Sequence, residues 1–281
     1  MRRSFINAAL VVFVSLGSVF FVTAYAASAL RLGLLPYISP QQLIETYKPL
    51  KSHLELTLKR PVILVTTRNF SEFLRAAEHL DYDIYHAPPH FSLLAEQDYH
   101  YRRLAKFSTA LYGSVLVRSD SQIHEPKQLR GRMLAMPDAL AAVTFLGEGW
   151  LRSIGLTPGQ DVRIQYLVSH ANALRAVLNH TADAAILSPA LLYAMPPAER
   201  GKLRELAKTN SVANTMFMAS PKMNDDDYRR VSAALLSFTA DGPGKVFFDK
   251  TGFGDIDEIT DDDMMSSNSL VALLKQRVRG K

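Results

Sequence analysis

The chain alternates short apolar runs with longer amphipathic ones over most of its length. The clearest amphipathic run, residues 40–58, carries apolar side chains three or four residues apart, as on one face of a helix: Leu43, Tyr47, Leu50, Leu54 and Leu58. The short apolar runs are typical of buried strands and cover residues 30–35, 62–66, 82–86, 101–107, 113–117, 132–136, 163–168, 184–187 and 215–219. This alternation predicts an α/β fold in which mostly parallel sheets are covered by helices.

Several expected helices begin at residues suited to a first turn. Asn69 can cap a helix over residues 70–78, and Asn224 can cap one over 225–238, where three aspartates favour the positive end of the helix dipole. The Pro88-Pro89 pair suits a first turn, because no N–H is required there. Further helices are expected over residues 144–154, 172–180 and 189–194, with two more helical stretches after the helix that ends at residue 238.

The strand–helix units fall into two series with a late return of the chain. We therefore expect two lobes, one made of residues 27–116 with 214–281 and the other of residues 117–213. Residues 111–118 and 211–218 would link the lobes as a two-segment hinge. Because open α/β sheets bind ligands beyond the carboxyl ends of their strands, a cleft is expected between the lobes.

The N-terminal segment has the features of an export signal. Arg2 and Arg3 precede an apolar run over residues 5–22, and residues 24–26 form a small-x-small cleavage pattern. This pattern predicts a signal peptide over residues 1–26 and a periplasmic protein. An uncleaved N-terminal anchor is the alternative, since the run is long enough to cross a bilayer.

Composition narrows the function classes. The 281-residue chain has no cysteine, so it has neither disulfides nor a thiolate metal site. Without the two arginines of the signal, the formal net charge falls from +5 to +3. That excess is small and no basic cluster with interleaved aromatics occurs, so nucleic-acid binding is not expected. We expect no cofactor and no catalysis, because the common nucleotide-binding, hydrolase and zinc-protease motifs do not occur in the sequence.

Six stretches, in this order along the chain, resemble the periplasmic phosphonate/phosphate-binding proteins of ABC importers. They are "TYKPLKSHLELTL", "YDIYHAPPHFSLLAE", "SQIHEPKQLRGRMLAMPD", "LRSIGLTP", "SHANALRAVLNHTADAAIL" and "MFMASPKM". The resemblance implies a two-lobed type II periplasmic-binding-protein fold that closes on a small-molecule solute, with an oxyanion as one option. Its implied partner is an ABC permease, and a monomer is expected. The alternative is the same fold serving as the ligand-sensing input of a membrane receptor or kinase.

The family's phosphonate-binding signature is altered in this sequence. The family places a Ser-Thr-Ser-Gly run at a helix start in the second lobe, and those positions here hold Leu140, Ala141, Ala142 and Val143. Backbone N–H groups at that helix start remain able to bind an anion. The substitutions predict weak or absent phosphonate binding, with either a weaker anion or a less polar solute in the site. His170 matches the histidine of the family's Ser-His pair.

Other candidate site residues follow from their positions at strand ends. Tyr37, His86 and Ser188 follow or end expected strands, and Tyr112 precedes the crossover between the lobes. Each has a structural alternative, since aromatic residues at strand ends often belong to the core and a histidine is often satisfied by nearby backbone. A metal at His86 and His90 is not expected, because the two prolines between them break any helix that would align the rings. The predicted ligand-binding set is Tyr37, His86, Tyr112, Leu140, Ala141, Ala142, Val143, His170 and Ser188.

Overall fold

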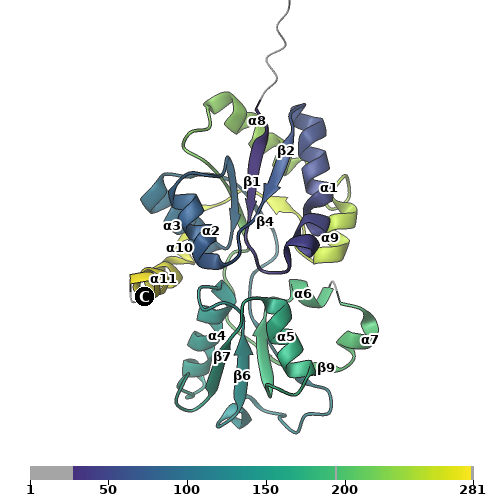
Figure 1. The fold of residues 1–281 in the computed structure, drawn as a ribbon, viewed down its shortest axis with the longest axis vertical. Coiled ribbons are helices and arrows are strands. Elements are labelled where there is room, and N and C mark those ends of the chain that lie inside the picture. Colours follow the sequence, from purple (N-terminus) through teal and green to yellow (C-terminus); the bar gives the residue numbers. More distant parts are fainter. Residues whose placement is uncertain (1–27, 194, 280–281) are drawn as a thin grey trace, which may run out of the picture.

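The computed structural model describes residues 28–193 and 195–279, which form two α/β lobes stacked along the long axis of the molecule (Figure 1). The predicted signal peptide lies outside the described residues. Within the described part of the chain, no helix is both long and apolar enough to cross a membrane.

The larger lobe is built on a six-stranded sheet. Its strands are β1 (Leu30–Leu34), β2 (Val62–Val65), β3 (Ile84–Ala87), β4 (Arg102–Phe107), β10 (Met216–Ala219) and β11 (Ile256–Asp257). They lie in the order β11-β4-β10-β3-β1-β2, with parallel pairing among β1, β2 and β3 and antiparallel pairing where β10 returns between β3 and β4. The return of β10 ties the C-terminal part of the chain to the N-terminal part.

Apolar helix faces cover both sides of this sheet. One side packs against α1 (Pro40–Leu58), α8 (Asp225–Leu236) and α9 (Lys245–Thr251). The other side packs against α2 (Phe70–Glu78), α3 (Pro89–Tyr99), α10 (Asp261–Met265) and α11 (Asn268–Arg279). The buried residues of α1 are the five apolar positions that its sequence spacing predicts.

The smaller lobe is built on a five-stranded sheet in the order β7-β6-β8-β5-β9. Its strands are β5 (Ser114–Arg118), β6 (Met133–Met136), β7 (Arg163–Tyr166), β8 (Ala184–Leu187) and β9 (Leu203–Lys208). Its helices are α4 (Ala142–Ser153), α5 (His170–Leu178), α6 (Ala190–Tyr193) and α7 (Pro197–Arg200). Helix α4 covers one face of the sheet and α5 the other, so this sheet is also buried on both sides.

The structure departs from the sequence-based expectation in several places, among them α7 and β11, which were not expected. Strand β9 was not expected, because none of its residues is buried and its apolar pattern is weak. Strand β5 belongs to the smaller sheet, so the boundary expected between residues 116 and 117 falls inside a strand. Three helices follow α8 in the described residues, not two. The extra one, α10, is five residues long and is held by a capping box between Thr260 and Asp263, which apolar periodicity does not reveal.

The lobes are joined by two crossovers that run side by side. The backbones of Leu111 and Val212, one on each crossover, exchange two N–H···O bonds of 2.9 Å. On one side of these crossovers, the start of α4 packs into the apolar core of the larger lobe between α2, α3 and α11. The lobes are therefore in direct contact, and not connected only by their linkers.

Helix α11 adds a polar contact between the lobes, near their junction in Figure 1. The guanidinium of Arg277 donates to the backbone carbonyl of Ala139 at 2.6 Å and to the Glu148 carboxylate at 2.8 Å, and it lies over the Phe145 ring at 4.4 Å. Tyr166 also donates to Glu148, at 2.8 Å. The Glu148 side chain is only 5% exposed. The hydrogen bonds from Arg277 and Tyr166 therefore replace those that its carboxylate gives up with water on burial.

The Arg277→Ala variant is expected to lower the free energy of unfolding by about 3 kcal/mol, because it leaves the buried Glu148 carboxylate without its closest cation. Lys275→Ala is the matched control on the same helix, since Lys275 pairs with the half-exposed Asp98 of its own lobe and should cost less than about 1 kcal/mol. Urea denaturation of both variants measures the difference. Equal losses of unfolding free energy in the two variants would show that the Arg277 contact between the lobes stabilises the protein no more than a surface ion pair does.

Candidate functional site

A cavity lies between the lobes at the carboxyl ends of several strands. It is lined from the larger lobe by residues just after β1 and β3, and from the smaller lobe by residues just after β6 and β8. The hollow encloses about 520 Å³ of space not filled by atoms, part of it open to solvent. Its position is the one expected for a ligand site in a two-lobed α/β protein.

Seven of the nine predicted site residues line this cavity: Tyr37, His86, Ala141, Ala142, Val143, His170 and Ser188. Leu140 does not, because its side chain is buried in the core between the lobes and its carbonyl accepts a 2.9 Å hydrogen bond from His90 Nε2. Tyr112 lines a neighbouring hollow instead, where Lys208 Nζ lies 5.1 Å from the centre of its ring.

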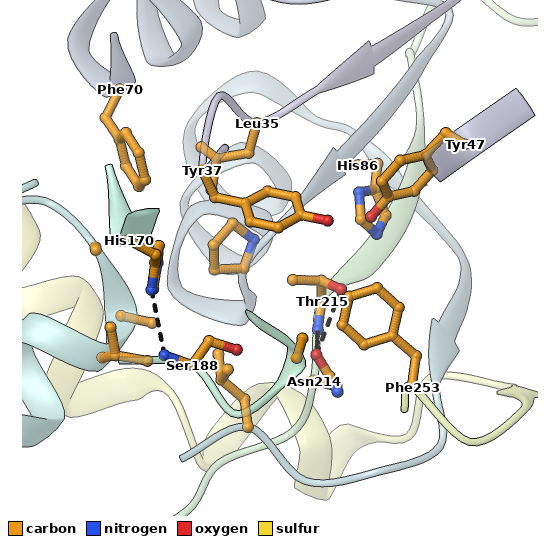
Figure 2. Close-up of a pocket in the computed structure, with 16 residues that line it drawn as sticks. Leu35, Tyr37, Tyr47, Phe70, His86, His170, Ser188, Asn214, Thr215 and Phe253 are labelled. Atoms are coloured by element: carbon orange, nitrogen blue, oxygen red, sulfur yellow. Dashed lines mark hydrogen bonds between the residues drawn. The ribbon is translucent and has the colours of Figure 1, made fainter. Parts of the chain in front are cut away.

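Sequence reasoning missed several residues that line the cavity. Tyr47, Phe70, Thr215 and Phe253 all contribute to its wall, and Figure 2 shows them around the same space as Tyr37 and His86. Tyr47 belongs to the apolar face of α1, so its spacing indicated only a core residue. The one signal that could have indicated a site residue was chemical: Tyr47 carries a polar hydroxyl on a helix face whose other buried residues are four leucines.

Two buried polar atoms of the cavity wall are poorly supplied with hydrogen-bond partners. Nε2 of the buried His86 has none among the described residues, and the fully buried Tyr47 hydroxyl interacts with the Tyr37 hydroxyl, which points toward it (Figure 2). The rings of Tyr47 and His86 lie 5.3 Å apart. Because a buried polar atom with unused hydrogen-bonding capacity costs free energy, these atoms indicate a place for a polar group of a ligand.

His170 has a defined hydrogen-bonding role at the other end of the cavity. Its Nδ1 accepts the backbone N–H of Ser188 at 3.2 Å, and burial lowers the pKa of His170 to about 4. The ring is therefore neutral near pH 7, and the proton resides on Nε2. The Ser169 side chain caps α5 by accepting a hydrogen bond from the backbone N–H of Asn172. This cap fixes where the helix begins and therefore where His170, its first residue, lies. His170 thus offers one N–H donor, whose direction the Ser188 contact determines.

The cavity carries no formal charge near neutral pH. Among the described residues that line it, none is Lys, Arg, Asp or Glu. Burial lowers the pKa of His86 to about 3, so this ring is neutral as well. Burial also raises the pKa of Tyr37 to about 12, an effect that the nearby Tyr47 hydroxyl partly offsets. The walls therefore offer neutral hydrogen-bonding groups and apolar surface.

The altered phosphonate-binding segment has become part of the packing between the lobes. No side chain caps α4 at Ala141, so the N–H groups of Ala142 and Val143, the first of the helix, have no partner within it. The side chains of residues 140–143 are each at most 3% exposed and pack with the aromatic core of the larger lobe. The segment offers two backbone donors and otherwise apolar surface to the cavity.

The described residues contain no group of three or more histidine and carboxylate side chains placed to hold a metal ion. His90 is directed away from a shared site with His86, because its Nε2 bonds to the Leu140 carbonyl.

Two α/β lobes that meet over a cavity at their strand ends, joined by two adjacent crossovers, define a type II periplasmic solute-binding protein. The chain belongs to the family of periplasmic substrate-binding proteins of phosphonate ABC transporters, which its sequence matches over residues 32–264. As a member of this family, it is the periplasmic substrate-binding component of an ABC transporter of the phosphonate type, and this favours transport over the sensing alternative.

Solved structures share the fold at low sequence identity. A binding protein component of an ABC phosphonate transporter from Pseudomonas aeruginosa has a TM-score of 0.77 and 15% identity, covering 90% of this chain and 88% of its own. PhnD1 from Prochlorococcus marinus, solved with methylphosphonate, has a TM-score of 0.77 and 13% identity, and the match covers 89% of this chain and 99% of PhnD1. A Xanthomonas citri protein bound to ATP has a TM-score of 0.67 and 21% identity, covering 90% and 99%.

Proposed function

We propose that the protein binds one small-molecule solute in the cavity between its lobes and delivers it to an ABC permease, without catalysing a reaction on it. The observation that carries this proposal is the pair of buried polar atoms at the cavity wall: His86 Nε2, which lacks a partner among the described residues, and the Tyr47 hydroxyl, which interacts with the Tyr37 hydroxyl and can make a further hydrogen bond. A bound solute would supply those partners. The contacting residues would be the seven predicted ones that line the cavity, together with Tyr47, Thr215 and Phe253.

Binding is coupled to lobe movement in this proposal. The two crossovers, over residues 111–118 and 211–218, would act as the hinge on which a monomer opens and closes. The lobes contact each other through bonds such as the 3.3 Å hydrogen bond from the backbone N–H of His170 to the backbone carbonyl of Tyr37. In this proposal these contacts belong to a closed form. Export would use the predicted signal over residues 1–26.

The solute of this protein differs from phosphonate in the proposal. The PhnD1 structure contains methylphosphonate, but the hydroxyl-bearing residues of the family signature are replaced here by Leu140, Ala141 and Ala142. A phosphonate in this cavity would receive hydrogen bonds from the Ala142 and Val143 N–H groups and from neutral side chains, with no cation to offset its charge.

A thermal-shift screen of the purified mature protein against a broad library of small solutes tests the proposed function. A solute that binds only the folded protein stabilises it by about 2.7 kcal/mol at one hundred times its Kd, so a ligand should raise the melting temperature by several degrees. The Tyr47→Phe variant should respond less, because it lacks the hydroxyl but keeps the ring. A library in which no member shifts the melting temperature would contradict the proposal.

A further inference from the structure

We propose that the cavity takes an uncharged, mostly apolar solute whose main hydrogen-bonding end lies between the Tyr47 hydroxyl and His86 Nε2. This inference rests on the proposed function and names the chemical class of the solute. It separates two possibilities that the sequence leaves open, a weaker anion held by backbone N–H groups and a solute less polar than phosphonate.

The first observation concerns charge. An ion that enters the cavity loses most of its water, and an opposite charge must offset that loss. The cavity wall has no cationic or anionic side chain among the described residues, and the charges of Arg277 and Glu148 at the contact between the lobes already pair with each other. An anion and a cation therefore both meet an unfavourable site, whereas a neutral molecule loses less hydration.

The second observation concerns two of the helix starts that face the cavity, those of α3 and α4. Pro88, at the start of α3, lines the cavity and is followed by Pro89, so neither of these two residues has an N–H to offer. The start of α4 offers only the N–H groups of Ala142 and Val143. Helix starts that bind anions present several N–H groups together, often with hydroxyl side chains. At the start of α4, the aliphatic side chains of residues 140–142 stand where the family signature has hydroxyl groups.

The third observation concerns the two ends of the cavity. The Tyr47 hydroxyl can donate or accept, and Nε2 of a neutral histidine does either according to its tautomer, so together they match a hydroxyl or an amide. Apolar side chains form much of the remaining wall, including Leu35, Phe70 and Phe253 (Figure 2). A molecule with one polar end and an apolar body fits this division.

A set of probes that share one phenyl ring tests the charge class. Benzyl alcohol and benzamide are uncharged, benzoate and phenylphosphonate are anions, and benzylamine is a cation at pH 7.5. Calorimetric titration and thermal shift of the mature protein are expected to show saturable binding of the uncharged members, with affinities at least tenfold higher than those of the ions. Tyr47→Phe should weaken benzyl alcohol binding about fivefold, the loss of one hydrogen bond. Tyr112→Phe, in the neighbouring hollow, is the matched control and should change nothing.

Each outcome decides the proposal. If an ion of this set binds as tightly as its uncharged counterparts, the charge assignment is overturned while the proposed function stands. If the whole set fails, the solute found in the broad library decides in its place: an uncharged one supports the assignment and an ion overturns it. If nothing binds in either experiment, the proposed function fails together with this inference. Equal affinities of Tyr47→Phe and Tyr112→Phe for benzyl alcohol would overturn the assigned position of the polar end.

Discussion

Lowering the pH from 7.5 to 5 is expected to reduce the free energy of unfolding by several kcal/mol. Burial lowers the pKa of His86 to about 3 and those of His90 and His170 to about 4, while each returns to its ordinary value near 6.5 in the unfolded chain. Below that ordinary value the unfolded state binds protons that the folded state does not. The stability from these neutral rings is therefore fully present above pH 6.5 and is lost as the pH falls toward 4.

The expected loss is about 2 kcal/mol for each of the three histidines at pH 5. Their mostly aromatic surroundings give a charged ring little compensation. His86 packs against the rings of Tyr47, Phe107 and Phe217, and His90 packs against Phe91 and Phe145. The hydrogen bond from His90 to the Leu140 carbonyl only partly opposes the effect of burial on its pKa.

Urea denaturation across this pH range, in wild type and in two variants, measures the effect. His170→Asn keeps an acceptor near the Ser188 N–H and removes the ring that titrates, so its loss of stability between pH 7.5 and 5 should be smaller by about 2 kcal/mol. His124→Asn changes an exposed histidine and should keep the full loss. A stability that does not change between these pH values would show that the buried rings gain no protons on unfolding.

The fold was largely predictable because its helices and strands carry strong local signals. Helix α1, helix α2 and strand β8 occupy the residues that spacing and capping predict. The failures have local causes of their own. Strand β9 is recognisable only by its pairing with β5, in which Leu203 pairs with Arg118, 85 residues earlier in the sequence. Helix α10 depends on a capping box instead of an apolar face.

The site was predictable in position but not in chemistry. The ends of β1, β3, β6 and β8 had to meet under any arrangement of two facing α/β lobes, so Tyr37, His86 and Ser188 were accessible to sequence reasoning. Tyr47 was not, because helical spacing gives a core residue and a residue at the cavity the same pattern. The packing of Leu140 against the other lobe depends on contact between the two lobes, which no local pattern encodes.

Methylphosphonate is expected to bind two to six orders of magnitude more weakly here than in a site that retains the hydroxyls of the family signature. Hydrogen bonds to a charged group contribute about 1.5–3 kcal/mol each, and two or three such donors are lost at residues 140–142. No cationic side chain in the described cavity replaces them. Its histidines are neutral near pH 7, and the only donors of the α4 start are the N–H groups of Ala142 and Val143.

Calorimetric titration of the mature protein with methylphosphonate at pH 7.5 tests the central claim, that a member of the phosphonate-binding family has a cavity unsuited to phosphonate. Phosphate and phosphite, titrated in the same buffer, extend the test to other oxyanions. A protein preparation that responds to a solute from the thermal-shift library serves as the positive control. The account predicts no saturable heat, or a Kd in the millimolar range, for all three anions. A submicromolar Kd for any of them would contradict it.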